Sequence, residues 1–324
     1  MNTFGHNFRI SLFGESHGKA VGVVMDGIPA GIPLSESDFK EDLARRKGGP
    51  LGTTTRVEAD TPEILSGIYR GHTTGAPMAI IFRNNCQQSD DYSSLITTPR
   101  PGHADWVAAQ KFGGWNDTRG GGHFSGRLTV ALVAAGVVAK KIVNAPIKAQ
   151  IVEIGGESNH QKWSEMLQEA INNGDSLGGV IECRAEGVEV GLGEPFFDSL
   201  ESTIAHLLFA IPAVRGVEFG DGFGAARMRG SEHNDPMVAP DGTTARNGAG
   251  GINGGISNGN PIVVRVAVKP TSSIAREQQT INLVTGKIEP LCIGGRHDGC
   301  IALRAAVVVE AAVAIALADA KLSR

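Results

Sequence analysis

Two long segments of this sequence are apolar on nearly every side. LTVALVAAGVVAKKIV covers residues 128–143, and IALRAAVVVEAAVAIALADA covers residues 301–320. A helix without a polar face has to be enclosed by protein, so both segments predict buried core helices. Neither predicts a membrane span of about 20 apolar residues, because the first is too short and the second contains Arg304, Glu310 and Asp319.

A cluster of glycine, arginine and histidine precedes each apolar segment. These clusters are RGGGHFSGR at 119–127 and GGRHDGC at 294–300. The repetition indicates an internal duplication, although alanine- and valine-rich helices also resemble one another by chance. We expect residues 1–324 to form a single domain with two internally similar halves, since single cores stop growing at ~250–300 residues.

The remaining pattern mixes strands and helices. Apolar or alternating runs at 8–12 and 20–27 predict a hairpin, and Ser35 is a suitable cap for a helix over SESDFKEDLARRK. Residues 85–127 are dense in small polar side chains, and a loop system of that length in a compact protein usually has a function. The other expected helices lie around 160–173 and near 198–210.

Composition and charge exclude several classes of protein. The net charge of −4 provides no basic surface for general nucleic-acid binding. The 4 cysteines are scattered, without CxxC pairs or a zinc-like spacing, and so predict buried thiols in a reducing compartment. MNTFGHNFRI has no charged region followed by an apolar stretch, so no signal peptide is expected. We therefore expect a soluble cytoplasmic protein.

The 44 glycines are the informative excess in the composition. Glycine lets the backbone turn tightly and approach a ligand closely. Arginine, which accompanies many of these glycines, binds phosphate and carboxylate through two parallel hydrogen bonds. If the glycine-rich clusters converge, they form a local cationic pocket for a small phosphorylated and carboxylated molecule. The clusters are GESHG (14–18), ARRKGG (44–49), RPGHAD (100–105), RGGGHFSGR (119–127), and KPTSS with GGRHD (269–273 and 294–298).

Each cluster alone also has a structural interpretation. Arg45 and Arg46 end a predicted helix, where cations stabilise the helix dipole. No GxxxxGK[ST] or strand-linked GxGxxG motif occurs, so neither a P-loop nor a dinucleotide site is predicted. The residues alone indicate a cytoplasmic enzyme that binds a small polyanion. A purely structural hydrogen-bonding role is assigned to His6, His72, His160, His206 and His233.

The order of the motifs along the chain is specific to one enzyme family. In this order the set resembles the chorismate synthase family across almost the whole length. The resemblance implies an α+β fold with helices sandwiched between two antiparallel β-sheets, in a pseudo-duplicated subunit of a homotetramer. The motifs are FRISLFGESHG, DGIPAGIPL, EILSGIYRGHTTGAP, QQSDDYS, RPGHADW, RGGG-x-x-S-x-R, GLGEP, GVEFGDGF, GGINGGIS, KPTSSI and GGRHD.

The same resemblance implies an activity. The family members are lyases of the shikimate pathway that convert 5-enolpyruvylshikimate 3-phosphate to chorismate and phosphate by a 1,4-anti elimination. They require reduced FMN (FMNH2), although the reaction has no net redox change. Some members reduce their own FMN with NADPH, and others receive reduced flavin from outside. The implied partner is therefore a small-molecule substrate, with no nucleic acid and no membrane.

Roles for individual residues follow from the resemblance. His17 matches the family histidine near the leaving phosphate, and Ser16 matches a serine of the same network. His103 matches the histidine at the N1–O2 edge of the flavin, and Asp298 matches a carboxylate near flavin N5 that relays the substrate proton. Ser125 completes the expected catalytic set. Imidazole suits both histidine positions because its ordinary pKa of ~6.5 allows either protonation state near neutrality.

Other matched positions are expected to bind the ligands, and no metal ligand is implied. The expected cofactor-binding residues are His123, Phe124, Ser125, Pro212, Ala213, Gly254, Lys269, Pro270, Thr271, Ser272, Ser273 and Arg296. The expected substrate-binding residues are Arg45, Arg46, Arg127 and His17.

The chain departs from the family pattern at several positions. Leu51 and Gly52 follow ARRKGG where many members carry an arginine. RGGGHFSGR replaces the common RGGGRSSAR, Pro212-Ala213 replaces an Asn-Ala pair, and HDG replaces HDP. Because the proton-handling residues persist, we interpret these changes as variation within the family that alters details of flavin binding.

Two other functions stay open on the sequence. One is a flavin reductase that turns over NADPH as its main activity. The other is a non-catalytic protein that binds a phosphorylated ligand. The presence of His17, His103 and Asp298 argues against the second, because a pure binder needs no set of three proton-handling groups.

Overall fold

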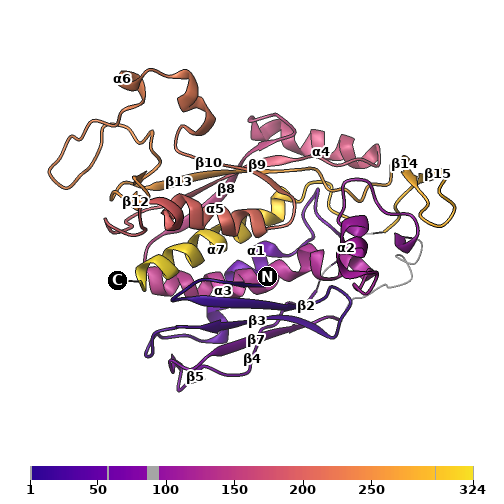
Figure 1. The fold of residues 1–324 in the computed structure, drawn as a ribbon, viewed down its shortest axis with the longest axis horizontal. Coiled ribbons are helices and arrows are strands. Elements are labelled where there is room, and N and C mark those ends of the chain that lie inside the picture. The colour runs from indigo at the N-terminus through magenta and orange to yellow at the C-terminus, as the bar shows by residue number, and fades with distance from the viewer. Residues whose placement is uncertain (1, 57, 86–94, 296, 324) are drawn as a thin grey trace.

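The computed structural model describes residues 2–56, 58–85, 95–295 and 297–323. Three helices form its middle layer, and an antiparallel sheet covers this layer on each side (Figure 1). The middle helices are α3 (Thr129–Val143), α5 (Leu200–Ala210) and α7 (Ala302–Lys321). A shorter helix, α1 (Lys40–Arg46), packs against α3 and α7.

The first sheet lies against α3. Its strand order is β1 (Thr3–Phe4), β2 (Arg9–Gly14), β3 (Ala20–Asp26), β7 (Met78–Arg83) and β4 (Glu63–Ile64), with every neighbouring pair antiparallel. Val21, Val23 and Met25 alternate along β3 and are fully buried, because successive side chains of a strand point to opposite faces. The predicted hairpin over 8–27 is confirmed as β2 and β3.

The second sheet covers the opposite side of the helices and packs against α7. Its order is β10 (Val214–Phe219), β13 (Ile262–Val268), β9 (Gly179–Ala185) and β8 (Ile147–Ile154), again antiparallel throughout. Ile181 of β9 pairs with Val266 of β13, and both side chains are fully buried. The layered arrangement of helices between two antiparallel sheets confirms the α+β prediction.

The two predicted core helices are confirmed and pack directly on each other as α3 and α7. At their contact a Cβ atom on Gly136 would lie 2.3 Å from the Cβ of Ala311. Glycine at this position therefore lets the two helix backbones approach closely. Lys140 and Lys141 near the end of α3 are only partly buried, which agrees with the polar end of an otherwise apolar segment.

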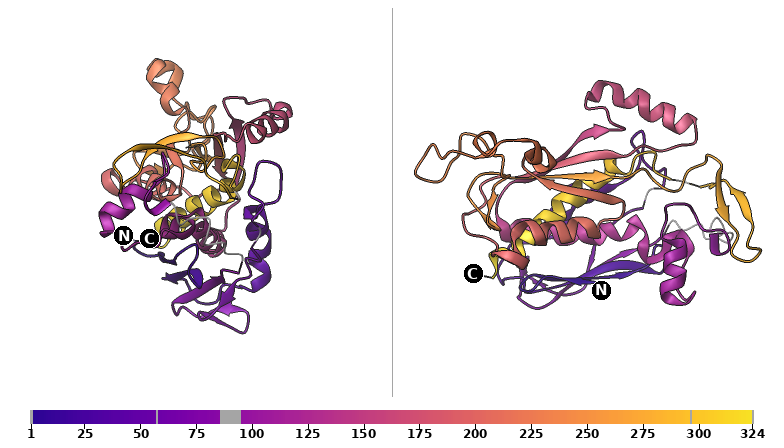
Figure 2. Two further views of the ribbon diagram at one scale, coloured as in Figure 1. Left: turned by 90° about the vertical axis from the view of Figure 1, so that its right-hand side faces the viewer. Right: turned by 45° about the horizontal axis from the view of Figure 1, so that its top comes forward.

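Smaller elements surround this core (Figure 2). The helix α2 (Asp105–Phe112) was not predicted, and it interrupts the long stretch 85–127 that we expected to be loop. The other helices are α4 (Trp163–Asn172) and α6 (Gly230–His233), with 3-10 turns at Glu36–Phe39, Arg119–Phe124, Gly126–Leu128, His160–Lys162, Phe196–Asp198 and Gly222–Arg227. Three two-stranded ribbons pair β5 (Ile68–Tyr69) with β6 (His72–Thr73), β11 (Ile252–Asn253) with β12 (Ile256–Ser257), and β14 (Gln278–Ile281) with β15 (Ile288–Leu291).

The first half of the chain contributes one large sheet followed by α3. The second half contributes the other sheet together with α5, and it ends with α7. The duplication itself stays a prediction. Among the residues that the structure describes, no helix is long and apolar enough to cross a membrane.

Candidate active site

A cavity of about 970 Å³ lies beside α3, α5 and α7. This volume is at the upper end of the ~300–1,000 Å³ that small-molecule sites occupy. Four of the five predicted clusters contribute to its wall, which confirms that ARRKGG, RPGHAD, RGGGHFSGR and KPTSS with GGRHD converge. Of the predicted site residues, those that line it are Arg46, His103, His123, Phe124, Ser125, Arg127, Pro212, Ala213, Lys269, Pro270, Thr271, Ser272, Ser273 and Asp298.

The wall of the cavity is strongly cationic although the whole chain is acidic. Among the described residues, eight arginine and lysine side chains line it against three carboxylates. The cations are Arg46, Lys47, Arg56, Arg100, Arg127, Arg215, Lys269 and Arg304, and the carboxylates are Glu58, Asp60 and Asp298. A low-dielectric cleft lined by one sign of charge concentrates ligands of the opposite sign. The cavity therefore suits an anionic ligand.

The GESHG cluster lies directly behind this wall. His17 and Ser16 are only 5% and 0% exposed, and neither lines the cavity, whereas Gly120 does. Gly120 has φ 59°, and a Cβ atom there would lie 2.4 Å from Cε1 of His17 and 2.9 Å from Oγ of Ser16. The backbone amide of Ser16 donates to the carbonyl of Gly122 at 3.0 Å. The RGGG loop therefore needs glycine to pack against the imidazole.

The surroundings of His17 favour its neutral form. Burial is the largest effect and lowers the pKa of His17, and the positive charges of Arg56 and Arg119 lower it further, against a hydrogen bond to the Arg119 backbone and the charge of Asp117. Arg56 also approaches the Ser16 hydroxyl, with 3.4 Å between Nη1 and Oγ. An anion beside these groups would shift the balance toward the imidazolium.

Arg46 and Arg127 share one buried carboxylate, Asp60. Arg46 Nη1 lies 3.2 Å from Asp60 Oδ2, and Arg127 Nη1 pairs with Oδ1 of the same residue. Arg46 also donates to Thr129 Oγ1 at 2.9 Å, and Arg127 donates to Asn84 Oδ1 at 2.9 Å. Burial and then the charge of a neighbouring arginine lower the pKa of Arg46 to about 9, which still leaves the group charged at neutral pH. These bonds fix both guanidinium groups in the wall.

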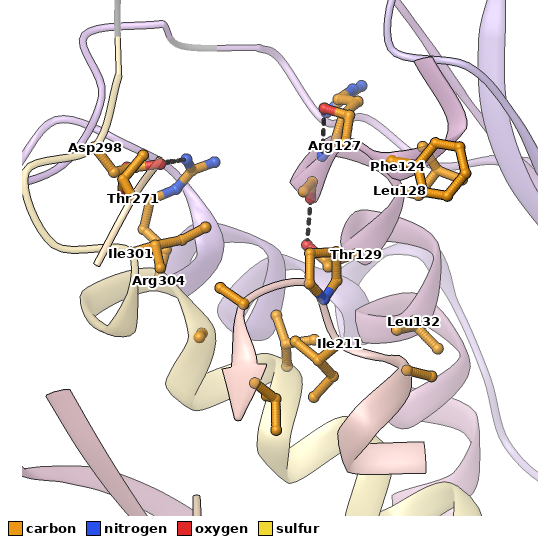
Figure 3. Close-up of a pocket in the computed structure, with 18 of the residues that line it drawn as sticks. Phe124, Arg127, Leu128, Thr129, Leu132, Ile211, Thr271, Asp298, Ile301 and Arg304 are labelled. Carbon is orange, nitrogen blue, oxygen red and sulfur yellow. Dashed lines mark hydrogen bonds and ion pairs between the residues drawn. The ribbon is translucent and has the colours of Figure 1, made fainter. Parts of the chain in front are cut away.

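Asp298 is held by two groups from other segments. Arg304 Nη1 lies 3.1 Å from Oδ2 and 3.2 Å from Oδ1 of Asp298, and the backbone amide of Thr54 donates to Oδ1 at 2.8 Å. Arg304 Nε in turn donates to the carbonyl of Arg46 at 2.9 Å. Figure 3 shows Asp298 and Arg304 on one side of the cavity and Phe124 on the other.

The RPGHAD loop is tied to the KPTSS segment. Lys269 Nζ donates to the carbonyl of Gly102 at 2.5 Å and to Ser272 Oγ at 2.8 Å, and Ser272 Oγ donates to the same carbonyl at 2.9 Å. Burial, followed by the charge of Arg215, lowers the pKa of Lys269. Within the described part of the chain, the buried Oγ1 of Thr271 has no hydrogen-bond partner. A ligand in the cavity would supply that partner.

The lower part of the cavity is apolar. Leu132 of α3 and Ile211, which follows α5, line it (Figure 3). At the rim the Phe124 ring is 38% exposed and lies 6.3 Å from the Phe112 ring. His123 instead is tied to the wall, because Nδ1 lies 2.8 Å from the Gly14 carbonyl and Nε2 lies 3.1 Å from Asn2 Oδ1.

Among the described residues, Arg45 and Gly254 are predicted site residues that do not line this cavity, in addition to Ser16 and His17 behind its wall. Arg45 points away because it pairs with the fully buried Glu310, with 2.5 Å between Nη2 and Oε1. Gly254 lies in the turn between β11 and β12, outside the residues that line the cavity. Arg296 lies outside the described residues.

Several residues of the site were not predicted. Arg56, Asp60 and Arg215 line the cavity but carry no local signal, because each is a single charge in a loop or at a strand end. Arg304 had a usable signal, since it interrupts an apolar segment just after GGRHD. A lone arginine at the start of a buried helix indicates a partner nearby.

Comparisons with known proteins agree with this geometry. The family model described as chorismate synthase matches residues 8–322. The chorismate synthase of Chitinophaga pinensis is 59% identical over 321 residues, which cover 98% of this chain and 96% of that protein. That of Thermococcus kodakarensis is 46% identical over 345 residues, covering 99% and 97%. A solved crystal structure of chorismate synthase superposes with a TM-score of 0.74 at 30% identity, covering 98% of this chain and 92% of that one.

Proposed function

The chain belongs to the chorismate synthase family and is a lyase, and from this premise we propose that it converts 5-enolpyruvylshikimate 3-phosphate to chorismate and phosphate. The reaction is a 1,4-anti elimination in the shikimate pathway. We propose that it uses reduced FMN without net redox change, and that it takes place in the cavity beside α3, α5 and α7.

The observation that carries this proposal is the composition of the cavity wall. In the described part of its wall, eight cations outnumber three carboxylates, and the substrate contains one phosphate and two carboxylates. Arginine and lysine are the side chains that bind such groups. The volume of about 970 Å³ is large enough to suit a substrate together with a cofactor.

The residues of the cavity also fit a flavin mononucleotide. Lys269 and Ser272 would hold its phosphate, and Leu132 and Ile211 would cover the apolar part of its ring. Thr271 Oγ1, which has no hydrogen-bond partner among the described residues, would gain one. When bound, reduced FMN supplies the electron density that assists departure of the phosphate. The protein contributes binding, orientation and proton positions.

We assign the leaving phosphate to the side of the cavity next to His17. Gly120 has no side chain, so the His17 ring lies directly behind the wall. The charge of a phosphate favours protonation of the imidazole, and the imidazolium then stabilises the phosphate as its bond to carbon breaks. Arg56 lines the same side of the cavity and approaches the Ser16 hydroxyl, so we assign it a second positive charge toward the phosphate.

Asp298 is assigned the proton that leaves the substrate ring. Its Oδ1 accepts from the amide of Thr54 and from Arg304, whereas among the described residues Oδ2 contacts only Arg304. We therefore propose that Oδ2 receives the proton as the C–H bond breaks and the new double bond forms. His103, on the opposite loop, is assigned a hydrogen bond to the N1–O2 edge of the flavin.

We further propose that the protein functions as a homotetramer in the cytoplasm. Exposed aromatic side chains support an assembly, because Phe196 and Phe197 are 85% and 91% exposed and adjacent in sequence. Apolar groups that are this exposed on one copy are commonly covered by another.

The proposal is tested anaerobically with purified protein, FMN reduced by dithionite, and synthetic 5-enolpyruvylshikimate 3-phosphate. Released phosphate and chorismate absorbance are followed together. Equal amounts of both products are expected. A parallel sample with oxidised FMN and NADPH, but no dithionite, shows whether NADPH supplies the electrons.

Two results would contradict the proposal. No product, although both ligands bind, would favour a non-catalytic binder of phosphorylated ligands. NADPH oxidation that continues without chorismate formation would favour a flavin reductase. Chorismate formed only with dithionite-reduced FMN supports the lyase and indicates that reduced flavin comes from outside.

A further inference from the structure

The RPGHAD loop places a carboxylate against the ring of His103. Oδ1 of Asp105 lies 2.6 Å from Nδ1 of His103, which is the distance of a short hydrogen bond. Asp105 is the first residue of α2, and His103 precedes it by two positions. Because the spacing is local and the helix starts here, the backbone itself sets the distance between the two side chains.

Arg100 fixes the carboxylate from the other side. Its Nε lies 2.7 Å from Asp105 Oδ2 and its Nη2 lies 2.7 Å from Oδ1, while Nη1 donates to Ser273 Oγ at 3.0 Å. Arg100 is only 5% exposed. Burial opposes ionisation of Asp105, but the hydrogen bonds from Arg100 and His103 outweigh it and hold the pKa of this carboxyl well below its usual range.

The tautomer of His103 follows from these contacts. Arg100 Nη2 also lies 3.0 Å from Nδ1, but a guanidinium only donates, and its Nη2 already has the carboxylate as an acceptor. The shorter contact, from Nδ1 to an ionised Oδ1, requires a proton on Nδ1. His103 lines the cavity, and its Nε2 lies 3.5 Å from where a Cβ atom of Gly121 in the RGGG loop would be.

We propose that Asp105 is a positioning residue for His103: it accepts the Nδ1–H bond and so leaves Nε2 as the ring atom that meets the ligand. Arg100 keeps Asp105 ionised and joins it to the KPTSS segment. The role of His103 toward the ligand rests on the proposed function, whereas the geometry of His103 and Asp105 does not. The alternative is that Asp105 only stabilises the start of α2, since acidic residues favour helix N-termini.

The test is solid-state 15N NMR of the full-length protein labelled at histidine, at a pH where the ring is neutral. The His103 signals are assigned by their loss in His103→Gln. In the wild type we expect the Nδ1–H tautomer. Asp105→Asn keeps the size of the side chain but offers Nδ1 an amide donor, and we expect the Nε2–H tautomer there, as in catalytic triads with the same change. Asp105→Ala is expected to give a mixture.

A matched control is Asp26→Asn, which removes a carboxylate from an ion pair between Asp26 of β3 and Arg9 of β2, with no histidine partner among the described residues. We expect it to leave the His103 signals unchanged. Turnover with dithionite-reduced FMN is measured on the same samples. Asp105→Asn is expected to lower kcat at least tenfold, and the double variant with His103→Ala is expected to be no slower than His103→Ala alone.

An Nε2–H tautomer in the wild type, or an unchanged tautomer in both Asp105 variants, would overturn the proposal. Additive losses in the double variant would also overturn it, because they would show that Asp105 acts independently of His103. A changed tautomer with unchanged kcat would support the positioning by Asp105 but contradict the role of His103 in the proposed function.

Discussion

Replacing Gly120 with alanine is the change that tests the packing of the RGGG loop on His17 most sharply. Gly120 has φ 59°, in the left-handed region that costs a residue with a Cβ atom about 1–2 kcal/mol. The new methyl group would also lie 2.4 Å from Cε1 and 2.5 Å from Nδ1 of His17. Ordinary contacts between carbon atoms are about 3.5–4.0 Å, so the ring and the loop must separate by roughly 1 Å.

A displacement of this size has a predictable effect on turnover. Misplacing a reacting group by about 1 Å can cost on the order of 10²-fold in rate. We therefore expect Gly120→Ala to lower kcat about 100-fold. FMN is expected to stay bound, because Lys269 and Ser272, which would hold its phosphate, lie outside the RGGG loop. The assay is anaerobic turnover with dithionite-reduced FMN, and flavin fluorescence measures binding.

The matched control is Gly71→Ala. Gly71 has φ 75°, but a Cβ atom there would have no neighbour within 4 Å. It therefore carries similar backbone strain without a clash, and its kcat is expected to equal that of the wild type. A kcat for Gly120→Ala within twofold of the control would refute the reasoning, because it would show that the position of His17 does not limit the reaction.

Two further predictions concern charge. Glu310→Gln is expected to lower stability by about 3 kcal/mol, the low end for a broken buried pair, because Arg45 and Lys140 stay 32% and 21% exposed. Burial opposes ionisation of Glu310, but these cations hold its pKa below the ordinary value. The ionised carboxylate therefore stabilises the fold, and this contribution is lost as the pH falls below about 4.3. The melting temperature of Glu310→Gln should change less on acidification than that of the wild type. Because burial lowers the pKa of His17, binding of inorganic phosphate near neutral pH is expected to be accompanied by uptake of a proton. Calorimetry in buffers of different ionisation enthalpy measures this uptake. An equal uptake in His17→Gln would contradict the prediction.

The local patterns of the sequence were sufficient for the core. α3 and α7 could be predicted because a helix without a polar face can only be buried, and the β2–β3 hairpin follows from two apolar runs in succession. The short helix α2 was missed because its eight residues follow a glycine-rich loop and contain few core positions, with only Ala108 buried.

The candidate site was also predicted only in part. The loops that line the cavity were predicted from their composition and from family resemblance, but their internal partners were not. Arg127 meets Asp60 and Asn84, which are distant in sequence, and no local pattern marks such contacts. The direction of Arg45 could not be predicted either, because adjacent residues on a helix point about 100° apart and only the fold shows which of Arg45 and Arg46 faces the cavity.

The central claim is that the cavity between the RPGHAD and RGGG loops is where the elimination takes place. The measurement that tests it most directly is anaerobic turnover of His103→Ala with dithionite-reduced FMN, together with the dissociation constant of FMN. We predict that kcat falls at least tenfold while FMN and substrate still bind. Wild-type turnover in this variant would contradict the claim, because the imidazole on the cavity wall would then have no part in the reaction.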